Sequence, residues 1–272
     1  MTKLRSGFPW VLIVCVGLLT SCQKSEQQQA QQKPEQQQPA APAKETPAPA
    51  PETVAAQPEK TAAPAAETPK TSGEQLVPLD IKLPKPMFVG TPTNIAVPNL
   101  EKPLGRPRPA FLAPVGTKNV AFKKPVTGSD EQPIIGELSM VTDGDKEAGE
   151  GSFVELGPML QYVTIDLKGR NTIYAIVVWH YHKQAVVYHD VIVQVADDKD
   201  FVTNVQTVFN NDIDNTSGRG VGKDMSYVET AEGKLIDAKG VQGRYVRLYS
   251  RGNTANDLNH YIEVEVYGKA VQ

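Results

Sequence analysis

The chain has 272 residues, of which 22% are charged, and a formal net charge of −3 at neutral pH. Both of its cysteines, Cys15 and Cys22, lie near the N-terminus, which excludes a disulfide framework or a cysteine metal site in the rest of the chain. From residue 116 onward, 16 Lys and Arg stand against 22 Asp and Glu. Because nucleic-acid binding needs a basic face, this acidic balance predicts no nucleic-acid partner.

The N-terminus has the features of a secretion signal. Lys3 and Arg5 precede an apolar run over residues 8–19, which is shorter than the about 20 residues that span a bilayer. The run ends in Leu-Thr-Ser-Cys, which resembles the bacterial lipobox that is cleaved before Cys22. Residues 1–22 are therefore predicted to be a lipoprotein signal peptide, with lipidated Cys22 anchoring the chain to the bacterial cell envelope. Gln after the cysteine resembles an outer-membrane sorting signal, for a cell with two membranes. The alternative is an ordinary secretory signal with a chance cysteine.

Residues 23–115 are predicted to be a disordered tether. Residues 23–73 consist mainly of Gln, Pro, Ala, Glu and Lys, and such a composition cannot bury enough apolar surface to offset its ordering entropy. Apolar residues return over 75–114 between recurring prolines, so this part could lie against the domain as an extended arm. The folded domain is predicted to cover 116–272.

Short strands are the only regular elements that the pattern of the domain supports. Residues 162–167 and 191–196 alternate apolar and polar side chains, the period-two pattern of a half-buried strand. Residues 172–179 are apolar in both phases, as in a central strand covered on two faces. In the last strand, Ile262, Val264 and Val266 are expected to face the core, opposite Tyr261, Glu263, Glu265 and Tyr267. These strands predict an all-β jelly-roll sandwich.

Four ordered landmarks carry a family resemblance. They are NVAFKKPVTGS at 119–129, VTDGD at 141–145, YVTIDL at 162–167, and the closing pair RYVRLYS and YIEVEVYG at 244–250 and 261–268. Together they resemble the discoidin domain, also called the coagulation factor 5/8 type C or galactose-binding-like domain. The resemblance covers residues 116–269. It implies a jelly-roll β-sandwich that binds ligands through its loops.

The same resemblance implies a structural calcium site. In the family, a loop of the Asp-Gly-Asp kind, backed by a Glu in the final strand, often holds Ca²⁺. The corresponding oxygen donors here are Asp143, Asp145, Ser152 and Glu263. The alternative is a plain turn, since Asp-Gly is also a common turn dipeptide.

A second acidic stretch, residues 210–218, alternates Asp212 and Asp214 with other residues. It lacks the glycine and the terminal Glu of an EF-hand loop, which favours a polar loop of Asx turns over a second metal site.

Histidines and aromatic rings gather at the predicted strand ends. All four histidines of the chain lie there. The predicted ligand-binding residues are His180, His182, Tyr188, His189, Asn253, Asn256 and His260. A sugar offers an apolar C–H face for a ring and hydroxyls for His and Asn. The alternatives are a zinc or copper site built on His-x-His, and buried histidines satisfied by the backbone.

Common enzyme motifs are absent: the chain has no nucleophile elbow, P-loop or His-Glu-x-x-His sequence. We therefore expect a non-catalytic surface lipoprotein that binds carbohydrate or a glycoconjugate. One alternative is an envelope or adhesion protein whose jelly roll binds another protein, and the other is a histidine-based metal enzyme.

Overall fold

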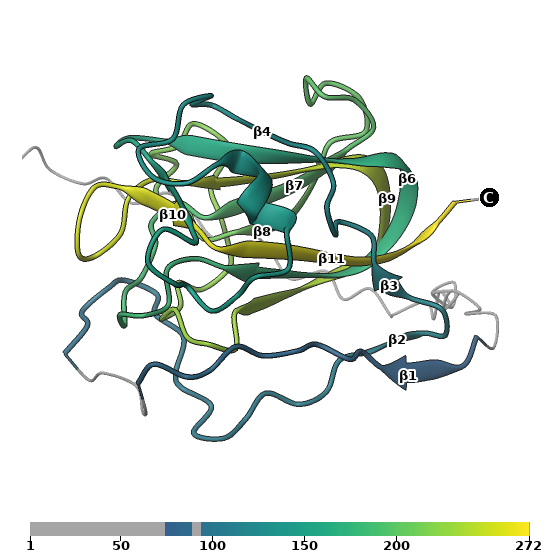
Figure 1. The fold of residues 1–272 in the computed structure, drawn as a ribbon, viewed down its shortest axis with the longest axis horizontal. Helices are drawn as coiled ribbons and strands as arrows, with labels where there is room; N and C mark the ends of the chain where they lie inside the picture. Colours follow the sequence, from purple (N-terminus) through teal and green to yellow (C-terminus); the bar gives the residue numbers. More distant parts are fainter. Residues whose placement is uncertain (1–73, 89–93, 272) are drawn as a thin grey trace, which may run out of the picture. The chain divides into compact units, whose positions relative to one another are not determined.

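A computed structural model describes residues 74–88 and 94–271 of the chain. The predicted signal peptide, lipidation at Cys22 and most of the predicted tether lie outside these residues. The described elements are one short 3-10 helix, η1 (Leu138–Thr142), and eleven strands (Figure 1). The strands are β1 (Leu76–Pro78), β2 (Leu112–Pro114), β3 (Lys118–Asn119), β4 (Val126–Gly128), β5 (Val154–Leu156), β6 (Gln161–Trp179), β7 (Ile192–Ala196), β8 (Gln206–Asn210), β9 (Lys234–Ser250), β10 (Asn259–Tyr261) and β11 (Glu263–Ala270). No helix in the described part of the chain is long and apolar enough to cross a membrane. The predicted all-β class is confirmed.

One antiparallel sheet forms most of the sandwich. Its strand order is β3-β11-β6-β9-β7-β8, and β4 pairs with the first half of β6. The two long strands β6 and β9 pair along their whole length, with breaks in register after Asp166 and Ile173. Figure 1 shows both strands curving sharply together, so that the sheet folds back over its own core. Two-stranded pairs, β1-β2 and β10-β5, complete the jelly roll.

The main core follows the predicted alternation. Val163 and Ile165 of β6, Val193 of β7, and Val246 and Leu248 of β9 are all fully buried in one cluster. Each such side chain stabilises the fold by about 1.5–3 kcal/mol relative to an exposed one.

The second half of β6 is covered on both faces, as its continuous apolar sequence predicts. Ile176 and Val178 belong to the main core, whereas Ala175, Val177 and Trp179 point to the opposite face and form a second buried cluster. That second face needs its own cover.

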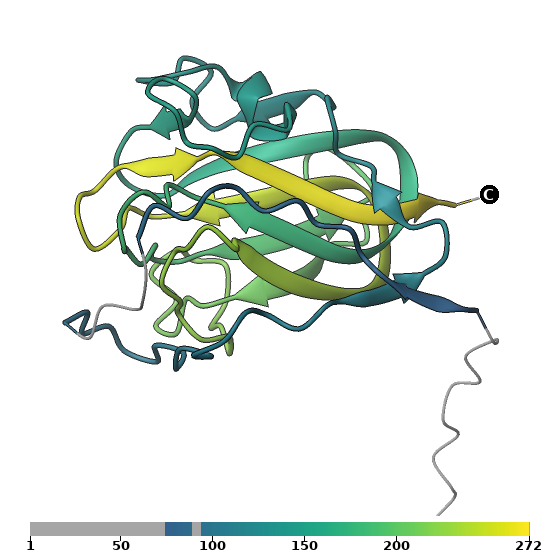
Figure 2. The same cartoon turned by 60° about the horizontal axis from the view of Figure 1, so that its bottom comes forward.

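An N-terminal arm, residues 74–88 and 94–115, supplies this cover. Leu79, Ile81 and Phe111 of the arm pack against the Trp179 cluster. The arm is also hydrogen-bonded, with β1 paired to β2 and the Glu101 amide donating to the Ser226 carbonyl at 2.8 Å. Figure 2 shows the first part of the arm, in dark blue, crossing in front of the strands. The described residues before 116 thus pack against the domain, as the extended arm considered for residues 75–114 would do.

The closing strands differ from the prediction in phase. Val264 and Val266 of β11 face the main core as expected, but Ile262 lies in the Trp179 cluster and Tyr261 lies in the main core. The reason is a break between β10 and β11 at Ile262, where the chain leaves one strand pair and joins another.

Candidate ligand pocket

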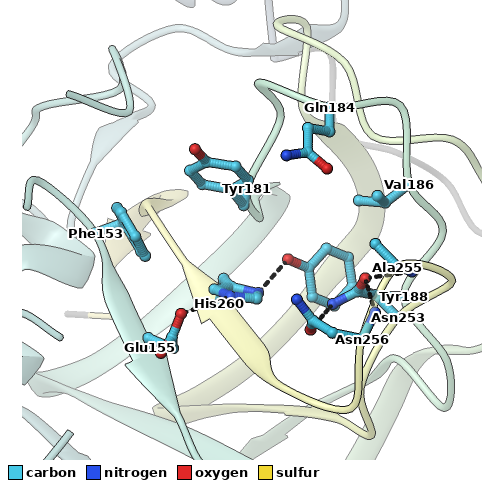
Figure 3. A pocket seen from close by; sticks show the side chains of 10 residues that line it. All are labelled: Phe153, Glu155, Tyr181, Gln184, Val186, Tyr188, Asn253, Ala255, Asn256 and His260. Carbon is cyan, nitrogen blue, oxygen red and sulfur yellow. Dashed lines mark hydrogen bonds and ion pairs between the residues drawn. The ribbon is translucent and has the colours of Figure 1, made fainter. Parts of the chain in front are cut away.

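A pocket of about 210 Å³ opens between β5, β10 and two loops, residues 180–190 and 251–258. Figure 3 shows its lining, with Phe153 and Tyr181 on one side and the loop residues Asn253, Ala255 and Asn256 on the other. The complete lining is Phe153, Glu155, Tyr181, Gln184, Val186, Tyr188, Asn253, Ala255, Asn256 and His260.

The pairing of β5 with β10 places an acid beside a histidine. Val154 and Leu156 are buried, so the alternation of β5 turns Glu155 toward the pocket. His260 is the direct cross-strand partner of Glu155, and side chains in this position lie within reach of each other. His260 Nε2 lies 3.1 Å from Glu155 Oε2, where its N–H donates to the carboxylate.

Tyr188 extends this contact into a chain of three side chains. Its hydroxyl lies 2.8 Å from His260 Nδ1. Burial lowers the pKa of His260, and this effect outweighs the opposing pull of the Glu155 carboxylate. A neutral ring that donates through Nε2 must accept through Nδ1, so the Tyr188 hydroxyl is the donor. The donor and acceptor roles of these three hydrogen-bonded side chains, Glu155, His260 and Tyr188, are thus fixed.

Aromatic rings form the apolar wall of the pocket. The ring centroids of Phe153 and Tyr181 are 5.0 Å apart, and each lies within 6 Å of the His260 ring, at 5.9 and 5.7 Å. These are ordinary spacings for tilted aromatic contacts. The wall thus lies against His260, the residue that is hydrogen-bonded to Glu155.

The 251–258 loop is shaped by one asparagine. Asn253 Nδ2 donates to Asn256 Oδ1 at 2.9 Å and to the Leu258 carbonyl at 3.0 Å, while its Oδ1 accepts from the amides of Ala255 and Asn256. Asn253 therefore holds the loop, and Asn256 is the exposed member of the pair at the rim.

The structure brings together four of the seven predicted ligand-binding residues: Tyr188, Asn253, Asn256 and His260. His180, His182 and His189 do not line the pocket. His180 is wholly buried with Nδ1 2.6 Å from Glu229 Oε1, and buried His182 contacts the Lys146 carbonyl through Nε2 at 2.9 Å. His189 holds the 251–258 loop through its backbone. His180 is buried because it follows Ile176 and Val178 on the face of β6 that points into the core.

Four further lining residues with polar or aromatic side chains were missed as ligand contacts: Phe153, Glu155, Tyr181 and Gln184. A signal was present, since Phe-Val-Glu-Leu at 153–156 alternates as a short strand does.

The predicted calcium donors are only partly gathered. The Gly144 amide donates to Glu263 Oε2 at 3.1 Å, which joins the 143–145 loop to β11. Glu263 Oε1 is buried and has no partner among the described residues. Burial, reinforced by the nearby Glu265 and Asp143, raises the pKa of Glu263 to about 9. An unpartnered buried carboxylate oxygen beside a second acid fits a hard cation.

The other two predicted donors fit less closely. Asp145 Oδ1 accepts the Glu147 amide at 2.9 Å, just as Asp143 Oδ1 accepts the Asp145 amide at 2.8 Å, but of the two only Asp143 helps to raise the pKa of Glu263. Within the described residues, the Ser152 hydroxyl makes no hydrogen bond to Glu263. Glu263 and Asp143 are therefore the residues that would hold a calcium ion, and its role would be to join the loop to the strand.

In the acidic loop 210–218, the carboxylates accept hydrogen bonds from nearby backbone amides and a hydroxyl group. Asp212 accepts the amides of Thr216 and Ser217, at 3.1 and 2.9 Å, and Asp190 accepts the Thr216 hydroxyl at 2.8 Å. Asp190, Asp212 and Asp214 form the one group of three or more potential metal ligands found in the described part of the chain, and it contains no histidine. The histidine-based metal site thus has no geometric support there.

No family model and no curated protein matches the chain. Solved structures do. The carbohydrate-binding module CBM32 of AlyQ, in complex with 4,5-unsaturated mannuronic acid, is 17% identical, with 53% of this chain and 95% of that chain covered and a TM-score of 0.40. A Streptococcus pneumoniae fucose-binding module, SpX-3, is 18% identical, with 55% and 97% covered and a TM-score of 0.39.

Two further matches are a chitosan-binding module and part of a larger enzyme. Chitosan-binding module 1 from a Paenibacillus sp. IK-5 chitosanase/glucanase is 20% identical, with 56% and 99% covered and a TM-score of 0.36. A Clostridium perfringens family 89 glycoside hydrolase is 18% identical, with a TM-score of 0.41, and the match spans 56% of this chain but only 15% of that enzyme. Over about half of its length, the chain is thus similar to these carbohydrate-binding modules at no more than 20% identity.

Proposed function

We propose that the protein binds carbohydrate without turning it over, at the pocket between β5 and β10. The observation that carries the proposal is the aromatic wall of Phe153 and Tyr181 beside the oriented chain Glu155–His260–Tyr188. A small cleft with an apolar wall and a few fixed polar groups is the usual form of a small-molecule site.

The pocket suits a single sugar ring at the end or side of a chain. Its C–H face would lie on the Tyr181 ring, and its hydroxyls would reach Glu155 and the amides of Gln184 and Asn256. So small a site buries little surface, and we expect dissociation constants of about millimolar to micromolar, or roughly −4 to −8 kcal/mol.

The acid content of the pocket supports binding over hydrolysis. The usual glycoside hydrolase mechanism needs two carboxyl groups that flank the scissile bond, about 5–5.5 Å or about 6.5–9.5 Å apart. Glu155 is the single carboxylate among the ten lining residues, and its Oε2 is engaged with His260.

We further propose that lipidated Cys22 anchors the chain to a bacterial envelope, on the outer membrane where the cell has two. A long Pro-rich tether would let many copies engage one polysaccharide, which raises avidity by about a hundredfold or more. A calcium ion held by Glu263 and Asp143 would stabilise the loop beside β11.

The test is titration of residues 23–272 against a panel of oligosaccharides and polysaccharides. Tyr181→Ala should lose at least tenfold in affinity for any ligand found while remaining folded, with a somewhat lower melting temperature because Tyr181 also packs against the Trp179 cluster. Tyr174→Ala is the matched control, because Tyr174 is a half-buried tyrosine of β6 that does not line the pocket. A folded protein that binds no member of the panel, or a Tyr181 variant that binds normally, would overturn the proposal.

A further inference from the structure

The pocket carries an unbalanced negative charge. Glu155 is its one acidic lining residue, and none of the ten lining side chains belongs to Lys or Arg. The neighbouring His260 does not compensate for this charge, because burial lowers its pKa and keeps the ring neutral near neutral pH. A ligand in the pocket therefore meets one carboxylate and no fixed cation.

That carboxylate is held in place rather than free to turn away. Its Oε2 accepts from His260, which in turn accepts from Tyr188. The Tyr188 ring is stacked on the buried His180 ring at a centroid distance of 4.3 Å. Glu155 is thus anchored through three side chains to the core, and its own side chain is only 14% exposed.

One carboxylate oxygen remains available to a ligand. Among the described residues, Glu155 Oε1 accepts no hydrogen bond, while Oε2 is engaged with His260. A partly desolvated carboxylate gains most from an ionised donor, since such hydrogen bonds are roughly twice as strong as neutral ones.

We propose that the pocket selects a sugar residue that carries a free, protonated amino group, a 2-amino-2-deoxyhexose, which pairs its ammonium with Glu155 while its ring lies on Tyr181. This inference rests on the proposed carbohydrate-binding function and assigns its ligand class. The same geometry should also disfavour N-acetylated sugars and uronic acids. N-acetylation removes the charge that Glu155 would pair with, and a uronic acid would bring a second carboxylate against the first, a repulsive contact of the kind that gives specificity.

The experiment compares three tetrasaccharides on residues 23–272 at low salt: β-1,4-linked glucosamine, its fully N-acetylated counterpart, and an oligo-mannuronate. The wild-type protein should bind the amino tetramer at least tenfold more tightly than the acetylated one and should show no measurable binding of the uronate. Added salt should weaken binding of the amino tetramer more than binding of the acetylated one, because only the amino tetramer is charged, and the effect should be modest because Glu155 is mostly buried.

Glu155→Gln is the decisive variant, because its amide oxygen can still accept from His260 while the charge is gone. It should bring the ratio of the two affinities close to one without changing the melting curve. Spermidine serves as the amine without a sugar ring and should compete at least tenfold more weakly than the amino tetramer.

The outcomes separate the two proposals. Equal or tighter binding of the acetylated tetramer by wild type, an unchanged ratio in a folded Glu155→Gln protein, or equal competition by spermidine overturns the assignment of an amino sugar and leaves carbohydrate binding standing. If Glu155→Gln does not fold, the wild-type ratio decides by itself. Absence of binding to every saccharide tested removes the proposed function and this inference together.

Discussion

His180 and Glu229 form a hydrogen-bonded pair in the centre of the domain, 2.6 Å apart and with neither side chain exposed. The second polar atom of each, His180 Nε2 and Glu229 Oε2, has no partner among the described residues. The hydroxyl of Tyr227 is buried nearby, and this burial, reinforced by the Glu229 charge, raises the pKa of that tyrosine. The pair therefore holds a polar centre inside an otherwise apolar core, directly behind Tyr188 of the pocket.

Removing one member of this pair should destabilise the protein strongly. Glu229→Ala leaves His180 buried without its partner, and such losses cost about 3–5 kcal/mol for a charged pair and about 1–3 kcal/mol for a neutral one. Urea unfolding of residues 23–272 measures the change, with exposed Glu150→Ala as the control. A Glu229 variant within about 0.5 kcal/mol of wild type would mean that the pair contributes nothing net.

Deleting the arm should expose Trp179. A chain that begins at residue 116 lacks Leu79, Ile81 and Phe111, so we expect a lower melting temperature and a red-shifted tryptophan emission relative to a chain that begins at residue 74. Trp179 is the only tryptophan after residue 22, so the emission reports on this face alone. Phe111→Ala in the longer chain should cost about 1–3 kcal/mol, in proportion to its partial burial. Identical spectra and melting curves for the two chains would show that the arm is dispensable.

Stability should fall as pH rises unless calcium is present. The pKa of Glu263 is about 9 in the folded protein against an ordinary value of 4.5. Between these values the native state keeps a proton that the unfolded state has released, so the contribution of Glu263 to stability is greatest below about pH 4.5 and is lost toward pH 9. The slope from this group is at most about 1.4 kcal/mol per pH unit.

A bound cation would reverse this trend, because it replaces the proton on Glu263. EDTA should therefore lower the melting temperature more at pH 8 than at pH 5, and Glu263→Gln should remove both the calcium response and this part of the pH dependence. An equal EDTA effect at the two pH values, or none on protein loaded with calcium, would contradict a metal at Glu263.

Lipidation should depend on Cys22. Labelled palmitate should enter the wild-type protein expressed in a bacterial host, whereas Cys22→Ser should incorporate none and leave the membrane fraction. Cys15→Ser is the matched control, since Cys15 lies inside the predicted signal peptide and should not matter. Membrane retention of the Cys22 variant would exclude the lipid anchor.

The sequence predicted the sandwich well because burial imposes its own period on a strand. Val163 and Ile165, or Val246 and Leu248, can reach the core only by alternating, and that alternation is legible in a single sequence. The phase of His180 followed from the same rule. His180 was nevertheless predicted to bind ligand, because a histidine at the end of a strand resembles a site residue. Its burial becomes evident only once Ile176 and Val178, which lie on the same face of the strand, are known to point inward.

The arm and the pocket depend on contacts between distant residues, and here a single sequence says less. Leu79, Ile81 and Phe111 are sparse among prolines, and although the apolar sequence of residues 172–179 predicts cover on both faces, nothing local identifies the segment that provides it. Glu155 and His260 are more than a hundred residues apart in the chain, and only the β5-β10 pairing makes them neighbours. Ring-bearing residues were a usable guide to Tyr188 and His260, whereas the acid beside them was not foreseen.

The position of the arm sets how the domain would respond to mechanical load. Strand β1 is the first described strand of the chain, and it is attached by three residue pairs to β2, while Glu74 just before it forms an ion pair with Lys269. Drag on a captured polysaccharide, opposed by an anchored N-terminus, would reach these attachments before any strand of the main sheet. The β1-β2 pair would therefore break first under load. The connection between the anchor and the domain would lengthen while the pocket keeps its shape.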